Sequence, residues 1–229
     1  MQLALKDEND QEKESLLRKS INVLTAVSEE LKKGEDIERL AGVMKSLGFA
    51  YGEMALYEDR AECVEREIEC YSEALGYYSA DKDSEHYADC QTSLGNAYKN
   101  KSELQIDAEA CILAIECYEK ALTVCDISSR PDDYAMVQNN LGAAYDMLAQ
   151  IEESAEHCRS AIGSYGNALD VYKPESNPGP YAMVSNNLGN AYCTLAEIED
   201  REGNCERAID CYRRSLEYRD ASSEPLEYA

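Results

Sequence analysis

The segment Tyr181-Ala-Met-Val-Ser-Asn-Asn-Leu-Gly-Asn-Ala-Tyr192 repeats Tyr134-Ala-Met-Val-Gln-Asn-Asn-Leu-Gly-Ala-Ala-Tyr145 almost unchanged, 47 residues further along the chain. A third copy, Tyr87-Ala-Asp-Cys-Gln-Thr-Ser-Leu-Gly-Asn-Ala-Tyr98, lies another 47 residues upstream. A fourth and weaker copy, Leu40-Ala-Gly-Val-Met-Lys-Ser-Leu-Gly-Phe-Ala-Tyr51, keeps the same register. A fixed period in this range is typical of stacked supersecondary units. We therefore expect one continuous array, built from contacts between neighbouring units.

Each unit contains two helical patterns. Wound at about 100° per residue, the first half of the last unit places these residues on one face: Tyr181, Val184, Leu188, Ala191, Tyr192 and Leu195. Such a stripe is typical of an amphipathic helix. The pattern predicts a tight turn around Gly203 and Asn204. A second helix is then predicted by the apolar positions Cys205, Ala208, Ile209, Tyr212 and Leu216.

The unit boundaries follow from this register. Residues 11–33 predict a single second-type helix that caps the array, and Gly34 is expected to end it. Prolines at the start of the first helices stand in register at positions 131, 178 and 225. Because Tyr228-Ala229 falls where another unit would begin, we expect the chain to be part of a longer array. The predicted segments are 1–39 (N-terminal helix and linker), the repeats 40–86, 87–133, 134–180 and 181–227, and 228–229 as the start of a truncated further repeat.

A second motif recurs in every unit, as Leu-Gly-x-x-Tyr followed by Ala-x-x-x-Tyr-x-x-Ala-Leu. In the second repeat, residues 87–133, it consists of Leu94, Gly95, Tyr98, Ala114, Tyr118, Ala121 and Leu122. This motif resembles the tetratricopeptide repeat, whose unit is usually about 34 residues. The resemblance is to a long-unit variety with Asn-Asn-Leu-Gly first helices, similar to kinesin light chain-type repeats. It implies an all-α, right-handed superhelical solenoid of antiparallel helix pairs, with four pairs after the N-terminal capping helix.

Glycines are repeated beside the apolar stripe of each first helix, at Gly48, Gly95, Gly142 and Gly189. We expect them to let two helix backbones approach closely, since glycine has no Cβ. The large tyrosines are expected to fill the space between successive units.

Asparagines lie opposite or beside the apolar stripe of the first helices. Asparagine is a weak helix former, so paired asparagines in the middle of a helix carry a repeated local cost. Each amide offers a donor and an acceptor together, which suits the backbone of an extended peptide. The resemblance implies a concave groove lined by the first helices, with peptide contacts from Asn96, Asn139, Asn140, Asn186, Asn187 and Asn190. The alternative is that recent duplication has copied an inert surface.

Four further residues are expected on the same concave face. Met136 and Met183 suit varied apolar partners because methionine is adaptable. Lys45 and Phe49 would make the start of the groove more basic and apolar than its later, amide-rich part. The basic residues of a carboxylate-binding clamp are missing from the later units, so we do not expect one.

The formal charge of −24 limits the classes of partner that the chain is expected to bind. Such a charge disfavours nucleic acids and anionic membrane surfaces, since nucleic-acid binding depends on Lys and Arg contacts to phosphate. We therefore expect a protein or peptide partner that is basic or neutral. The sequence has no apolar run long enough for a membrane span and no signal-peptide pattern at its start. These features predict a cytoplasmic protein whose ten cysteines are reduced.

No catalytic, cofactor or metal site is predicted. The two histidines, His86 and His157, stand outside any repeated pattern, and the cysteine spacings match no metal site. The acidic run from Glu197 to Glu202 is interpreted as a solvated helix end. We therefore predict a non-enzymatic scaffold for protein–protein interaction. Two alternatives remain open, namely end-to-end self-association of the array and a regulatory or sensor segment within a larger signalling protein.

Overall fold

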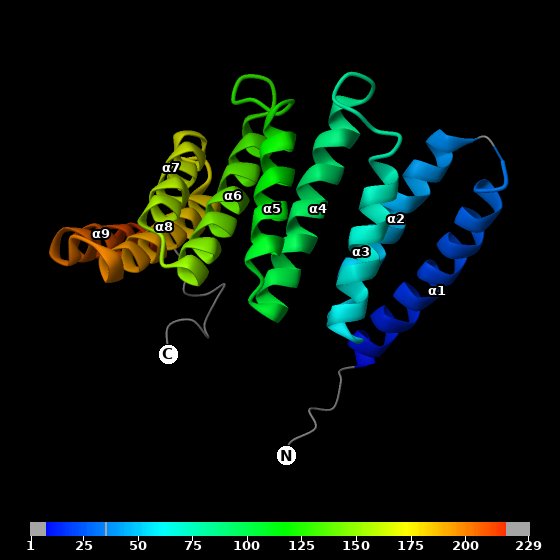
Figure 1. The fold of residues 1–229 in the computed structure, drawn as a ribbon, viewed down its shortest axis with the longest axis horizontal. Helices are drawn as coiled ribbons and strands as arrows, with labels where there is room; N and C mark the ends of the chain where they lie inside the picture. Colours follow the sequence, from blue (N-terminus) through cyan, green and yellow to red (C-terminus); the bar gives the residue numbers. More distant parts are fainter. Residues whose placement is uncertain (1–7, 35, 219–229) are drawn as a thin grey trace, which may run out of the picture. The chain divides into compact units, whose positions relative to one another are not determined.

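Nine α-helices and no strand make up residues 8–34 and 36–218, which are the residues that the computed structural model describes (Figure 1). The expected all-α architecture is confirmed. The predicted start of a further repeat at residues 228–229, and Pro225, lie outside the described residues. The helices are α1 (Glu8–Leu31), α2 (Ile37–Met54), α3 (Arg60–Ala74), α4 (Ser84–Gln105), α5 (Ala108–Leu122), α6 (Pro131–Glu152), α7 (Ala155–Val171), α8 (Pro178–Ile198) and α9 (Arg201–Tyr218).

The first helix of each pair begins where the sequence period places it. Helices α2, α4, α6 and α8 start at residues 37, 84, 131 and 178, at intervals of 47. Aspartates cap the first two of these helices. Asp36 accepts a hydrogen bond from the Arg39 amide at 3.2 Å and Asp83 accepts one from the His86 amide at 3.1 Å. The later two begin on Pro131 and Pro178, as predicted, because a first-turn residue needs no amide donor.

The turn before the last helix differs from the prediction. Helix α9 already begins at Arg201, so Gly203 and Asn204 lie inside it, and the chain reverses at Asp200, whose φ is 40°. The physical reason is the side chain of Asn204, which is 1% exposed. Its amide donates to the Glu199 carbonyl at 2.9 Å, so it closes the end of α8 instead of forming a turn.

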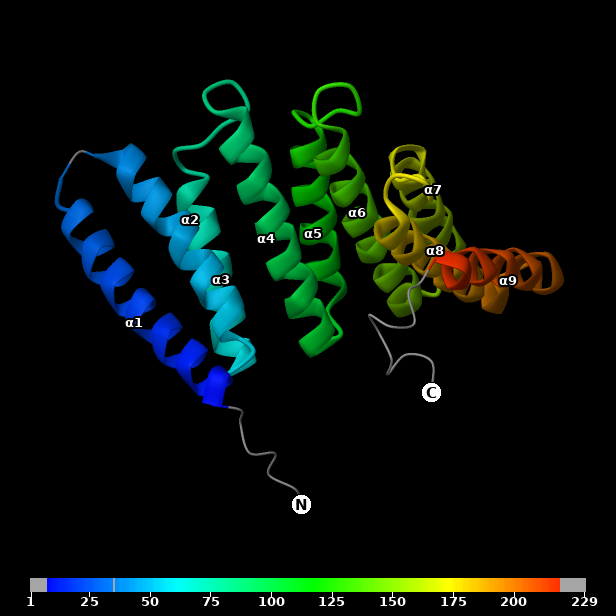
Figure 2. The ribbon, with the colours of Figure 1, turned by 180° about the vertical axis from the view of Figure 1, so that it is seen from behind.

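The chain divides into two compact units, residues 1–110 and 111–229, and the division falls inside α5. In the first unit, α1 packs against α2, α2 against α3, and α3 against α4. In the second unit, α6, α7, α8 and α9 pack in chain order, and the first helices α6 and α8 also touch each other (Figure 2). Within each compact unit, the first helices of successive pairs therefore touch, α2 with α4 and α6 with α8.

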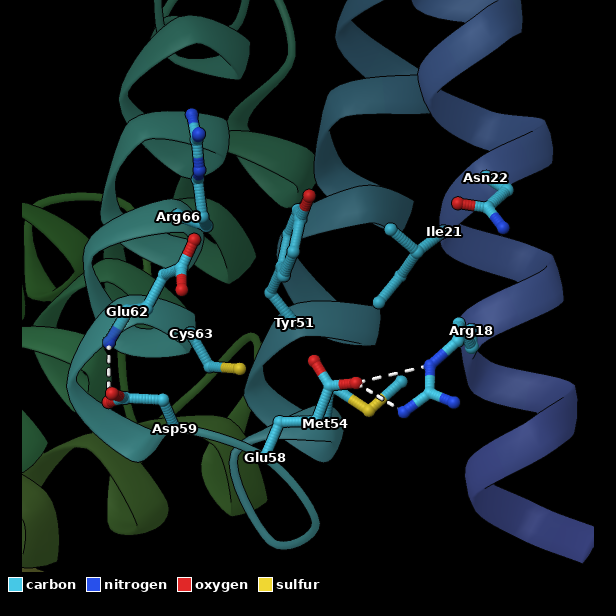
Figure 3. A pocket seen from close by; sticks show the side chains of 10 residues that line it. All are labelled: Arg18, Ile21, Asn22, Tyr51, Met54, Glu58, Asp59, Glu62, Cys63 and Arg66. Atoms are coloured by element: carbon cyan, nitrogen blue, oxygen red, sulfur yellow. Dashed lines mark hydrogen bonds and ion pairs between the residues drawn. The ribbon is translucent and has the colours of Figure 1, made fainter.

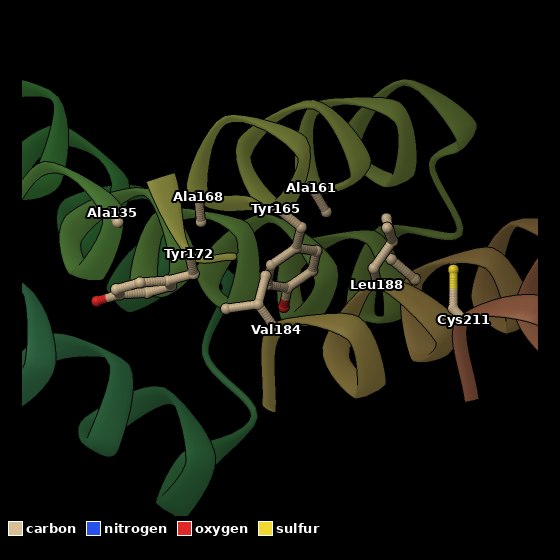
Figure 4. Packing of buried hydrophobic residues seen from close by; sticks show 9 residues of the cluster. Ala135, Ala161, Tyr165, Ala168, Tyr172, Val184, Leu188 and Cys211 are labelled. Atoms are coloured by element: carbon tan, nitrogen blue, oxygen red, sulfur yellow. The ribbon is translucent and has the colours of Figure 1, made fainter. Parts of the chain in front are cut away.

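The core of the second unit is a cluster of small and aromatic side chains from α6 to α9. Figure 4 shows Tyr165 and Val184 within it, together with the Tyr172 ring and several alanines. The cluster consists of Ala135, Ala161, Tyr165, Ala168, Tyr172, Val184, Leu188, Ala191 and Cys211. Tyr165 of α7 thus packs against α8 of the following repeat, as expected for the tyrosines.

At three of the four repeated glycines, Gly48, Gly142 and Gly189, the nearest neighbour is a tyrosine ring and not the expected second backbone. A Cβ at Gly142 would lie 2.7 Å from a ring carbon of Tyr165, and one at Gly189 would lie 2.6 Å from the Tyr212 ring. At Gly48 the nearest atoms belong to the Tyr71 ring, at 3.0 Å. The ring of the second helix therefore lies flat against the first helix of its own pair, which sets their separation.

Candidate functional site

Helices α6 and α8 carry seven of the residues expected on the concave face. These two helices lie in contact within the second unit. Met136, Met183 and Asn190 are exposed, and Asn140, Asn186 and Asn187 are half-buried. Asn139 differs from these, because only 7% of it is exposed. The surface therefore presents two methionines and several amides, but not every asparagine faces outward.

Two of the asparagines connect the first helices to each other. The Asn187 amide donates to the Asn139 side-chain oxygen at 3.0 Å, which bridges α8 and α6. The Asn139 amide in turn donates to the Asn140 oxygen over a longer 3.4 Å. Because only 7% of Asn139 is exposed, this bridge gives a largely buried polar side chain a hydrogen-bond partner. Asn139 and Asn187 therefore help to set the geometry of the surface on which Met136 and Met183 stand.

Replacing Asn187 with alanine is expected to lower the free energy of unfolding by about 1–3 kcal/mol, because it leaves the buried Asn139 oxygen without its donor. Urea denaturation followed by circular dichroism measures this loss. The neighbouring half-buried Asn186 provides the control, since Asn186→Ala removes an amide of the same type without breaking the bridge. Equal effects of the two substitutions would show that the bridge contributes nothing specific.

Asn190 also has a partner that the sequence reasoning missed. The Tyr212 hydroxyl of α9 donates to the Asn190 oxygen at 2.8 Å and lies 3.4 Å from the Cys193 sulfur. Burial, followed by the hydrogen bond with Cys193, raises the pKa of Tyr212 above its ordinary value. The phenol therefore stays protonated and remains a donor. In the sequence, Tyr212 stands at a repeated tyrosine position for which only packing is expected.

In the first unit, Lys45 and Phe49 lie on α2 and Asn96 lies on α4. The Lys45 ammonium forms an ion pair with Asp89 of α4 at 2.8 Å. This acidic partner neutralises the charge that was expected to make the groove basic at its start. Phe49 is 64% exposed, which is unusual for a phenylalanine, and Asn96 is half-buried. Apolar character at this point of the surface therefore comes from Phe49.

Comparison with known proteins identifies the type of repeat. Residues 182–221 match the family model described as tetratricopeptide repeat. The last helix pair, α8 and α9, is therefore similar to a tetratricopeptide repeat. A crystal structure of MamA aligns with 96% of this chain and 99% of its own, at 17% identity and a TM-score of 0.59. A crystal structure of BtubC (BKLC) from P. vanneervenii aligns over 91% of this chain and 92% of its own, at 18% identity and a TM-score of 0.50. A comparison with curated protein sequences gave no match.

The first compact unit contains a hollow of about 600 Å³ between α1 and the pair formed by α2 and α3 (Figure 3). The Arg18 guanidinium of α1 crosses its mouth and binds Glu58 at 2.5 Å and 3.1 Å. Glu62 and Arg66 of α3 line the opposite wall, and the buried Cys63 thiol points into the space. Charges of both signs thus lie around one hollow, and the ion pair of Arg18 fastens α1 to the turn after α2.

Within residues 8–34 and 36–218, no group of three or more His, Cys, Asp or Glu side chains is placed to hold a metal ion. Each histidine contacts a carboxylate at a helix end, His86 with Asp83 at 2.9 Å and His157 with Glu152 at 3.0 Å. Among the same residues, no helix combines the length and apolarity needed to cross a bilayer.

Proposed function

We propose that this protein is a non-enzymatic scaffold that holds an extended peptide or a helix of a partner protein against its first helices. The observation that carries the proposal is the pair of exposed methionines, Met136 and Met183, at equivalent positions on the adjacent helices α6 and α8. Exposed methionines offer an adaptable apolar surface. The amides of Asn140, Asn186 and Asn190 lie on the same helices and supply donors and acceptors for a peptide backbone.

The charge of the chain supports a basic or neutral partner. A net charge of −24 raises the rate of encounter with cationic segments and opposes anionic ones, nucleic acid included. In the first unit, the exposed Phe49 would contact an aromatic or aliphatic side chain of the partner. Lys45 is already paired with Asp89. We place this activity in the cytoplasm, and we keep the assignment to long-unit, kinesin light chain-type repeats as part of the proposal.

The test is a random peptide library selected against the full chain, followed by affinity measurements on the selected peptides. The groove variant combines Met136→Ala, Asn140→Ala, Met183→Ala and Asn190→Ala, and it leaves the Asn139–Asn187 bridge intact. We expect it to weaken binding at least about tenfold, since truncating central contacts of an interface costs more than about 1 kcal/mol each. Fluorescence polarisation with labelled peptides measures the affinity.

The matched control replaces Asn167 and Asp170 with alanine, because both are exposed on the second-type helix α7. This variant is expected to keep wild-type affinity. If the groove variant binds the selected peptides as well as the control does, the first helices are not the binding surface. Circular dichroism of both variants establishes that they are folded.

A second function, end-to-end self-association, is favoured by the exposed side of α9. Ile162 and Leu169 of α7 pack against the core that α8 completes. Their equivalents on α9, Ile209 and Leu216, are exposed. A second copy that covers them would give a mass that rises with concentration in light scattering, and Ile209→Glu would abolish that rise. A constant monomeric mass at high concentration would exclude this function.

A further inference from the structure

Helix α1 carries apolar side chains on two sides. Its inner side packs against α2, where Ile21 is buried and points toward Tyr51 (Figure 3). On another side, Leu16, Val23 and Val27 are exposed, by 38% to 63% each. Large apolar side chains gathered on an exposed surface are typical of a site that another protein covers. The end helix of a repeat array usually has a polar outer face, so this side of α1 differs from that of an ordinary cap.

The repeat register identifies what this face does in the other second-type helices. The four positions 16, 20, 23 and 27 correspond, 47 residues further on, to Cys63, Glu67, Cys70 and Ala74 of α3. The equivalent positions are all buried in α3, α5 and α9, and three of the four are buried in α7. In α3, the Glu67 carboxylate lies against Gly52 of α2, which is the first helix of its own pair. On α1 the same four positions are exposed, so α1 has a helix-docking face that no helix of the described residues covers.

The spacing of this face is that of a coiled coil. Six exposed residues follow one another at intervals of 3, 4, 3, 4 and 3 positions, which is the alternation of the a and d positions of a heptad. They are Lys13, Leu16, Ser20, Val23, Val27 and Glu30. We call this set the α1 stripe. Leucine and valine at such positions insert between the side chains of a facing helix, so the expected occupant of the face is another helix.

The α1 stripe is complementary to itself when two copies of α1 run antiparallel. A two-fold axis between Ser20 and Val23 places Leu16 opposite Val27 of the second copy. The same axis places Lys13 opposite Glu30 of the second copy, at both ends of the stripe. A parallel arrangement would instead place each lysine opposite a lysine and each glutamate opposite a glutamate. The charges therefore favour the antiparallel arrangement, since opposite charges attract.

The end charges of the α1 stripe are accessible to a second copy. Glu30 is bound to Lys33 of its own helix at 2.6 Å, and both side chains are at least 70% exposed. A carboxylate has two oxygens that accept hydrogen bonds, so Glu30 can bind the lysine of a second copy as well. The stripe spans most of α1, whose 24 residues give a length of about 36 Å.

We propose that α1 is a dimerisation helix, which pairs antiparallel with α1 of a second copy of this chain through the α1 stripe. The second copy takes the place of the first helix that α1 lacks in the described residues. Such an interface is closed, because a two-fold axis uses the same surface on both chains. It goes beyond the proposed scaffold function, and it lies on a different helix from the exposed side of α9. A dimer would carry two copies of the surface formed by α6 and α8, so it would hold a partner with two binding segments more tightly than a monomer does.

Sedimentation equilibrium of the full chain tests the proposal over a range of concentrations. We expect a mass that rises from the monomer value of 25.6 kDa and levels off at twice that value. The expected dissociation constant is on the order of 10 μM, because only three apolar side chains of each chain enter the interface. A constant monomeric mass, or a mass that rises beyond the dimer without levelling off, would overturn the proposal.

Val23→Glu is expected to weaken the dimer at least about a hundredfold, because it buries a carboxylate without a partner on each side of the axis. Val23 is exposed in the single chain, so the variant should fold as the wild type does, and circular dichroism checks this. Ile209→Glu is the matched control, since it places the same charge at an exposed apolar position of α9. This control removes association through α9 alone, so its mass should still double. Equal dimerisation of Val23→Glu and the control would show that α1 is not the interface.

A charge exchange tests the antiparallel register. Lys13→Glu alone is expected to weaken the dimer at least about fivefold, because it replaces two attractive pairs with two repulsive ones. The double variant Lys13→Glu, Glu30→Lys restores opposite charges at both ends and is expected to recover most of the affinity. In a parallel dimer neither variant would change the affinity, because like charges face each other before and after the exchange. An unchanged affinity of Lys13→Glu, or no recovery in the double variant, would therefore overturn the proposed arrangement.

Discussion

Replacing Tyr165 with alanine is expected to destabilise the second unit by about 3–5 kcal/mol, the range for removing a large aromatic side chain from a packed core. Tyr165 is 2% exposed and belongs to the cluster formed by α6, α7, α8 and α9. Its ring occupies the space above Gly142, where an added Cβ would lie 2.7 Å from a ring carbon. Four of the eight other buried residues in this cluster are alanines, which are too short to fill the cavity left behind.

Urea denaturation of the full chain measures this effect, with far-ultraviolet circular dichroism as the signal. Tyr165→Phe is the control, because it keeps the ring and is expected to cost no more than about 1.5 kcal/mol. If alanine and phenylalanine destabilise the protein equally, the ring does not hold α7 against its neighbours. A loss confined to the second unit would also show that the two units unfold separately.

Replacing Glu67 with glutamine is expected to stabilise the first unit at neutral and alkaline pH. Glu67 of α3 is buried, one of its oxygens has no partner, and the other lies beside Gly52 of α2. Burial raises the pKa of this carboxyl from 4.5 to about 7, and repulsion from Glu53 adds to the rise. An ionised carboxylate in this position is costly because its desolvation is not compensated.

The sign of the pH dependence follows from the raised pKa. Between pH 4.5 and 7 the folded protein holds a proton on Glu67 that the unfolded chain has lost. The contribution of Glu67 to stability is therefore fully present below pH 4.5 and is lost as the pH rises to about 7. At about 1.4 kcal/mol per pKa unit, the loss amounts to about 3 kcal/mol. Glutamine cannot ionise, so the variant should gain this amount over the wild type above pH 7 and almost nothing below pH 4.5.

Chemical denaturation at a series of pH values measures the difference between variant and wild type. Glu62→Gln on the same helix is the control, since Glu62 is exposed and its substitution should change stability by no more than about 0.5 kcal/mol at any pH. A difference for Glu67→Gln that stays constant with pH would show that Glu67 titrates normally in the folded state.

The sequence was sufficient to predict the repeated helix pairs, because local properties govern them. The 47-residue register placed the starts of α4, α6 and α8, and Pro131 and Pro178 marked the first turns of two of these helices. Tyr181 to Leu195 have the spacing of an amphipathic helix, and this spacing depends only on residues a few positions apart. The turn at Asp200 was missed because Asn204 reaches back to a carbonyl of the preceding helix.

The candidate site could be predicted only in part. All seven residues expected on α6 and α8 lie on two helices that touch each other. A helical wheel predicts only the order of positions around one helix. The wheel does not say how deep a neighbouring helix covers each position. Asn139 and Asn140 are adjacent in sequence, yet Asn139 is buried and bound by Asn187 while Asn140 is half-buried.

Pairing between side chains of different helices is a property of the tertiary structure alone. Lys45 forms an ion pair with Asp89, and Asn190 accepts a hydrogen bond from Tyr212. Glu152 and Glu199 each contact a basic side chain, whereas Glu153 and Glu197 contact none in the described residues. These outcomes depend on distances between side chains that lie on different helices, 5 to 44 positions apart in the sequence, which periodicity does not encode. Helix formation and register thus follow from short-range pattern in the chain, while the accessible and uncompensated groups emerge only when helices pack and some polar side chains satisfy one another.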